Sequence, residues 1–264
     1  MLLITDLRRK RLKNQALPSP WLSVMERNVS LYRRLSGEDR EELHGHIKVF
    51  LAEKNFEGKG DLTMSDEVRV TIAAQACLLL LHRGTDYYPG LYSIVVYPGE
   101  YLAPYREVDE CGIVTEGRDC RSGESCPEGA LVLSWEDVVA EGLDVHPGYN
   151  VVLHEFAHQL DAEDGITTGI TLLPKRSRCR IWEETLNYEF ERLREDTENG
   201  RPTVLDPYGA ESPGEFFAVA TETFFENPYR LRERHPDLYG ALTSYYRQDP
   251  AEWPAVTPDQ LPAL

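Results

Sequence analysis

The residues best suited to do chemistry lie in one stretch, His154-Glu155-Phe156-Ala157-His158, which is an HExxH pattern. Positions four apart share one face of a helix, so both imidazoles can turn toward a single ion. Glu155 is offset from His154 by about 100° around the helix, which lets its carboxylate reach a water held by that ion. The pattern predicts one zinc ion per chain, held by two neutral nitrogens, with Glu155 as the base that deprotonates the water.

HExxH fixes only three positions, so the residues around it decide whether the match indicates a metal site. Apolar residues precede it at 151–153 and continue at Phe156, Ala157 and Leu160, which predicts a largely buried helix. Two histidines and a glutamate on such a helix need partners, because unpaired buried polar groups cost kilocalories. The alternative, two surface histidines beside a salt-bridging glutamate, fits a buried helix poorly.

Two aspartates follow the second histidine. Asp164 comes ten residues after His154, where the extended pattern HExxHxxGxxH/D has its last ligand. Asp161, however, occupies the position at which that pattern needs a glycine to turn the chain. Asp161 lies one helical turn after His158, so it could accept the second ring N–H of a ligand histidine and fix its tautomer. A helix cap or a salt bridge is the alternative for Asp161.

A catalytic zinc site needs a third protein ligand, and a later helix offers two carboxylates. Glu215 and Glu222 are seven residues apart and share one face of a helix that begins at Ser212. Ser212-x-x-Glu215 is also a capping box, which would explain Glu215 without a metal. Glu222 has no such explanation, so spacing alone leaves both glutamates open as the ligand.

Hydrophobic periodicity predicts an α+β fold that is mostly helical, with a small mixed sheet beside the HExxH helix. We expect strands at 93–97 and 130–135, a hairpin or extended loop over the site within 104–129, and helices at 37–53, 66–82, 178–199, 212–225 and 236–246. The second strand could be an edge that binds a substrate backbone, or an ordinary internal strand.

Composition limits the function classes. The 264 residues include 28 basic and 45 acidic side chains, a net charge of −17, which argues against a nucleic-acid partner. No apolar run approaches the length of a membrane helix, and basic residues follow the short apolar start, the wrong order for a secretory signal. We therefore expect a cytoplasmic protein without a membrane partner.

The domain organisation and the cysteines follow from the same survey. We expect an exposed N-terminal arm at 1–20, a single domain at 21–250 and a Pro-rich tail at 251–264. Five cysteines suggest reduced thiols. Cys77 is expected in the core, a Cys120–Cys126 disulfide is conceivable in an oxidising setting, and the lack of a CxxC pair argues against a structural zinc at Cys111, Cys120 and Cys126.

Taken together, these motifs resemble the Mlc titration factor A family of zinc peptidases. The resemblance covers roughly residues 20–250 and is carried by NVVLHEFAHQLD (150–161), LSW (133–135), PGEFFAVATETFF (213–225) and YYRQDP (245–250). It implies a cytoplasmic zincin-type peptidase, similar to aminopeptidases in activity, with a metal-site core like that of anthrax lethal factor. The Cys-containing stretch 111–128 does not match the family and leaves loop-borne specificity open.

The resemblance also implies roles for single residues. His154, His158 and Glu215 match the zinc ligands and Glu155 the catalytic base. Tyr208 matches a tyrosine that hydrogen-bonds the developing oxyanion. Asp161 and Glu222 remain candidates for orienting the histidines.

The predicted function is therefore hydrolysis of a peptide or protein substrate by a zinc-dependent, aminopeptidase-like enzyme. Family members also bind and inactivate a transcriptional repressor of sugar uptake. The first alternative is thus a binding protein that sequesters such a regulator with little or no catalysis. The second is a metal hydrolase acting on a non-peptide bond.

Overall fold

The computed structural model describes residues 2–108, 114–126, 129–143, 148–163 and 176–254. Its main sheet has four strands in the order β1-β2-β6-β5. These strands are β1 (Asn55–Gly58), β2 (Ser93–Tyr97), β6 (Ala130–Ser134) and β5 (Gly123–Cys126). The first three strands are parallel, and β5 pairs antiparallel with β6. The predicted strand at 130–135 is therefore internal, and β5 forms the sheet edge next to it.

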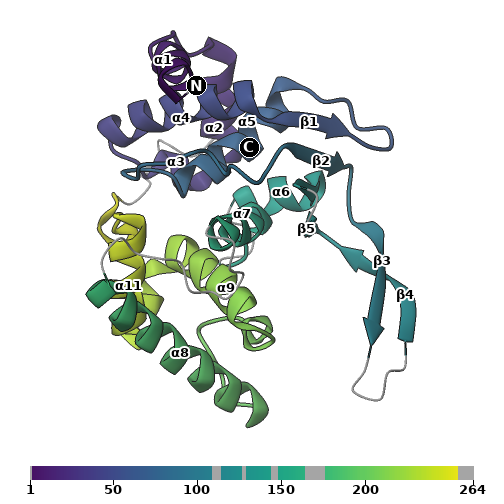
Figure 1. Cartoon of the computed structure of the whole chain (residues 1–264), viewed down its shortest axis with the longest axis vertical. Coiled ribbons are helices and arrows are strands. Elements are labelled where there is room, and N and C mark those ends of the chain that lie inside the picture. Colours follow the sequence, from purple (N-terminus) through teal and green to yellow (C-terminus); the bar gives the residue numbers. More distant parts are fainter. Residues whose placement is uncertain (1, 109–113, 127–128, 144–147, 164–175, 255–264) are drawn as a thin grey trace.

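A separate hairpin follows β2. Strands β3 (Tyr101–Val108) and β4 (Val114–Arg121) pair antiparallel, with Tyr101 opposite Arg121. Figure 1 shows this hairpin projecting away from the helices. The hairpin expected within 104–129 is present, but the strand of this region that packs on α7 is β5.

The cysteine predictions fall mostly outside the described part of the chain. Cys77 is a free, fully buried thiol, as expected. Cys111 and the side chains of Cys120 and Cys126 lie outside the described residues, so the disulfide stays a prediction.

Helices from the first third of the chain pack around α4 and α5 (Figure 1). They are α1 (Leu2–Lys13), α2 (Ser19–Asn28), α3 (Ser30–Arg33), α4 (Gly37–Glu53) and α5 (Asp66–Leu78). Helix α5 ends four residues before the predicted boundary, because the chain continues in tighter three-residue turns, with Leu80 N–H donating to Cys77 C=O and Leu81 N–H to Leu78 C=O. Arg9 of α1 pairs with Glu53 of α4 at 2.8 Å, which fastens the N-terminal helix to the rest of the fold.

The last third is helical and includes the second element of the site. It comprises α8 (Arg176–Glu198), the 3₁₀ turn η1 (Pro207–Ala210), α9 (Pro213–Glu226), α10 (Pro228–Arg234), α11 (Pro236–Tyr246) and the turn η2 (Pro250–Glu252). Ser212 caps α9 by accepting from the Glu215 N–H at 3.2 Å, with Pro213 in the first turn. Every residue from Phe216 to Phe225 is buried, so α9 is held on all sides.

The HExxH helix lies between these two groups of helices. Helix α7 (Val151–Ala162) follows α6 (Trp135–Gly142) and packs against α9, α5 and the sheet. Asn150 caps it by accepting from the Leu153 N–H at 3.0 Å. The Phe156 ring meets Phe50 and Tyr88 with centroids 5.7 and 4.8 Å away. The apolar side of α7 is thus held by the core. The protein has the expected α+β fold with a small mixed sheet.

Candidate metal centre

The two histidines of α7 face the same point. Their ring centroids are 4.8 Å apart, and the Nε2 atoms of His154 and His158 approach to 3.2 Å. One helical turn separates the residues, and both side chains are partly buried. The geometry directs two ring nitrogens into one small space.

A carboxylate from α9 completes this group. Glu215 Oε2 lies 3.0 Å from His154 Nε2 and 3.4 Å from His158 Nε2. Ligand atoms of a tetrahedral zinc ion, each about 2.0–2.1 Å from the metal, stand about 3.3 Å apart. The three observed separations match those of one face of such a tetrahedron. His154, His158 and Glu215 therefore fit a three-ligand metal site with a fourth position open.

Glu222 occupies the other side of the His154 ring. Its Oε1 lies 2.7 Å from His154 Nδ1, and its Oε2 accepts from the Asn150 N–H at 2.7 Å. The Glu222 side chain is only 8% exposed, so these bonds replace lost hydration. A carboxylate on Nδ1 fixes the ring and leaves Nε2 to face an ion.

The charges of the cluster favour a cation at its centre. Burial lowers the pKa of His154, but hydrogen bonds to Glu215 and Glu222 outweigh it and raise that pKa to about 10. Burial raises the pKa of Glu215, but hydrogen bonds from His154 and His158 bring it down to about 2. Carboxylates on both sides of the His154 ring thus favour positive charge at this point, and metal ions and protons compete for the ligand nitrogens.

Glu155 lies against the edge strand of the sheet. Its side chain is buried, at 6% exposure. A Cβ added at Gly123 of β5 would come within 2.8 Å of Glu155 Cγ, Glu155 Oε1 and Val151 Cγ2. A glycine in a strand often marks such a close approach, but β5 itself is not evident from the sequence, so Gly123 could not be singled out there. The missing side chain at Gly123 makes room for the Glu155 carboxylate.

Tyr208 lies on the η1 turn with 48% of its surface exposed, and its ring centroid is 6.1 Å from that of His154. Asp206 caps η1 by accepting from the Tyr208 N–H at 2.7 Å, and it also accepts from the Tyr149 hydroxyl. This second bond raises the pKa of Tyr149 to about 12. These two hydrogen bonds to Asp206 stabilise the η1 turn, which holds Tyr208 beside the histidine pair.

The predicted role of Asp161, orienting a ligand histidine, stays a prediction. Asp161 is buried, at 2% exposure, and acts electrostatically on Tyr246. The carboxylate on His154 Nδ1 belongs to Glu222. Asp164 lies outside the described residues.

Glu141 of α6 is a supporting residue that sequence reasoning missed. Its Oε2 accepts from the Val151 N–H, the first of α7, at 2.5 Å. Burial raises the pKa of Glu141 to about 7 although this hydrogen bond opposes the shift. The first N–H group of the HExxH helix is thus hydrogen-bonded to a carboxyl group whose pKa lies near neutral pH.

Comparison with known proteins identifies similar chains. A family model described as glucose-regulated metallo-peptidase M90 matches residues 4–247. An uncharacterised protein of Synechocystis is 40% identical over 93% of this chain and 90% of its own length. Proteins named Mlc titration factor A are 34% identical in Pectobacterium atrosepticum, over 84% of each chain, and 30% identical in Edwardsiella ictaluri, over 88% of each. The resemblance inferred from the motifs is confirmed.

Among the described residues, no helix combines the length and apolar character needed to cross a membrane.

Proposed function

The chain belongs to the glucose-regulated metallo-peptidase M90 family, and we propose that it is a zincin-type peptidase holding one zinc ion through His154, His158 and Glu215. The observation that carries this proposal is the convergence of two Nε2 atoms and one carboxylate oxygen at mutual separations of 3.0 to 3.4 Å. Nitrogen and oxygen donors in this number suit a catalytic zinc site, which keeps one position for water.

Each residue of the site has a role in the proposed hydrolysis. A bound zinc ion supplies Lewis acidity that acidifies a water and polarises the substrate carbonyl. Glu155 accepts the proton that the attacking water loses and later donates it to the leaving amine. Glu222 accepts the Nδ1–H of His154 and keeps the ring in one orientation. The Tyr208 hydroxyl donates to the developing oxyanion, a contact typically worth about 3 kcal/mol.

The finer form of the proposal is aminopeptidase-like cleavage of peptides in the cytoplasm. It draws on the resemblance of the motifs to a family with that activity. The neighbouring edge strand β5 lies against α7 and is a natural position for an extended peptide.

A second candidate function rests on the relatives' names. Mlc titration factor A, as a name, says that those proteins titrate Mlc, which makes sequestration of a transcriptional regulator the alternative for this chain. In that case the metal site would stabilise the fold, and hydrolysis would be slight or absent.

Glu155→Gln separates the two functions. Loss of the base should lower kcat by about 10²- to 10⁴-fold while zinc remains stoichiometric, since Glu155 is not among the proposed ligands. We would measure zinc by elemental analysis and cleavage by product masses from a mixed peptide library. Glu163→Gln, the same change at the exposed end of α7, is the matched control. Wild-type turnover by Glu155→Gln would rule out the proposed mechanism, and inactive wild-type protein with full zinc would favour the binding function.

A further inference from the structure

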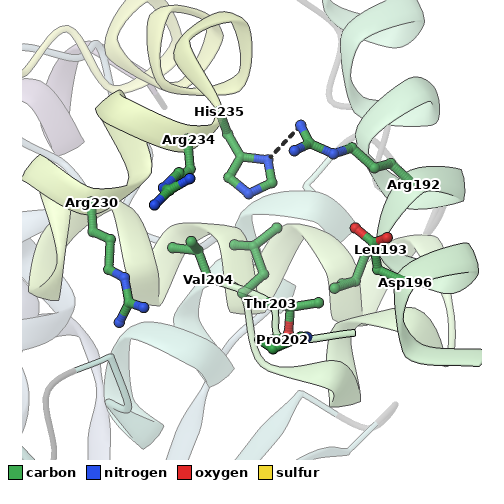
Figure 2. A pocket seen from close by; sticks show the side chains of 10 residues that line it. Arg192, Leu193, Asp196, Pro202, Thr203, Val204, Arg230, Arg234 and His235 are labelled. Carbon is green, nitrogen blue, oxygen red and sulfur yellow. Dashed lines mark hydrogen bonds between the residues drawn. The ribbon is translucent and has the colours of Figure 1, made fainter. Parts of the chain in front are cut away.

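A cavity of about 340 Å³ lies among residues that the proposed peptidase site does not use. Figure 2 shows it between helix α8, the segment 202–205 and the end of α10. Four of its lining residues carry basic groups, namely Arg192, Arg230, Arg234 and His235. In a chain with 45 acidic and 28 basic side chains, such a gathering needs an explanation.

Two of these arginines lack an acidic partner. Arg230 and Arg234 are one helical turn apart on α10, and neither forms an ion pair or side-chain hydrogen bond within the part of the chain that the structure describes. Asp196 is the acid in the cavity wall, and it is already paired with Arg201 at 2.9 Å. Like charges facing one hollow repel each other unless an anion enters.

The other two basic groups are held in place by a buried acid. Glu189, 4% exposed, accepts from His235 Nδ1 at 2.7 Å and from Arg192 Nη1 at 3.3 Å. Because His235 Nδ1 carries the proton that it donates to Glu189, the Arg192 group 3.4 Å away cannot donate to that nitrogen. Figure 2 shows Arg192 and Arg234 on either side of the His235 ring.

The shape and the remaining walls indicate the size of the ligand. A guanidinium group presents several N–H donors in a fork that matches an oxyanion, and three such groups suit a phosphate dianion better than one carboxylate. The volume exceeds what a bare phosphate ion needs and approaches that of small-molecule sites. Leu193 and Val204 form an apolar part of the cavity wall, and the Thr203 hydroxyl can donate or accept a hydrogen bond.

We propose that this cavity binds the phosphate group of a small phosphate ester through Arg192, Arg230 and Arg234. The site is independent of the metal centre and would exist whether or not the chain hydrolyses peptides.

Titration calorimetry of the full-length, zinc-loaded chain tests the proposal, with inorganic phosphate, glycerol 3-phosphate, glycerol and acetate as probes at constant ionic strength. We expect saturable binding of both phosphate compounds but not of glycerol or acetate. Tighter binding of the ester than of inorganic phosphate supports a phosphate ester as ligand, whereas equal affinities would overturn that part and leave a site for free phosphate.

Variants of α10 locate the binding. The double variant R230Q/R234Q should weaken phosphate binding at least tenfold, or about 1.4 kcal/mol. Arg232→Gln is the matched control, because Arg232 is on the same helix but pairs with Glu252 outside the cavity. Phosphate bound to zinc would persist in R230Q/R234Q. Equal affinity of this variant and wild type, or no saturable binding by folded wild type, would overturn the proposal.

Discussion

The metal centre and the basic cavity are both built where helices meet, yet they treat charge in opposite ways. At the metal centre, each side of the His154 ring faces a carboxylate, Glu215 on Nε2 and Glu222 on Nδ1. In the cavity, Arg230 and Arg234 have no acidic partner among the described residues. One region is internally balanced, whereas the other leaves two positive charges to water or to an anion from solution.

Burial explains the difference. Glu222 is almost wholly shielded from water, so leaving it unpaired would cost several kilocalories. Arg230 and Arg234 are exposed, and water can solvate them at little cost. A balanced, buried cluster should therefore be sensitive to the loss of any member, whereas the cavity should tolerate changes and reveal itself only in ligand binding.

The largest effect is expected from the carboxylates of α9. Glu215→Ala should abolish stoichiometric zinc, whereas Glu222→Ala should weaken zinc binding by roughly 10- to 100-fold, because it removes only the group that orients His154. Elemental analysis after dialysis and competition with a chelator measure both. Glu211→Ala, an exposed acid just before α9, is the control. Equal zinc retention in the two α9 variants would refute the distinction between ligand and orienting group.

A smaller effect is expected from the edge strand. Gly123→Ala should displace the Glu155 carboxylate, since the added Cβ would come within 2.8 Å of it, and lower kcat by roughly 10- to 100-fold with zinc unchanged. Gly90→Ala, where a Cβ meets nothing within 4 Å, is the matched control. A shifted pH profile of kcat would mark an effect on the base. Unaltered kcat in a folded Gly123→Ala protein would show that β5 does not position Glu155.

The smallest effect concerns stability. The pKa of Glu141 is about 7 in the fold against an ordinary 4.5, so the folded chain binds the proton more tightly. The contribution of Glu141 to the free energy of unfolding is fully present below about pH 4.5 and is lost as pH rises through about 7. Glu141→Gln keeps an acceptor for the Val151 N–H without the charge. Its stability relative to wild type should increase by about 1–3 kcal/mol between pH 5 and 8 in urea unfolding. Parallel pH dependence in both proteins would contradict this assignment.

The sequence was most informative where local pattern and chemistry coincide. HExxH, together with its apolar flanks, predicted the position of α7 and the common direction of His154 and His158. The seven-residue interval predicted that Glu215 and Glu222 share a face of α9. The interval could not identify which glutamate is the metal ligand. That depends on which end of α9 reaches the Nε2 atoms and which end lies behind His154.

Other features depend on contacts between distant segments. β1 and β5 are four residues long with glycines at their ends, so neither shows an alternating apolar pattern. The role of Gly123 follows from its packing on Glu155, 32 positions later, and the basic cavity joins arginines from α8 and α10. Such juxtapositions arise from topology, which single-sequence periodicity does not encode.

Helix α9 carries Glu215 near its start and Glu222 two turns further on, about 10 Å along one rigid rod. Its last residue, Glu226, is followed at once by α10, which bears the unpaired arginines. Because every residue from Phe216 to Phe225 is buried, this rod holds the two carboxylates at a fixed spacing. Metal binding and the orientation of the His154 ring are therefore set by one and the same helix, so a substitution that shifts α9 would alter both at once.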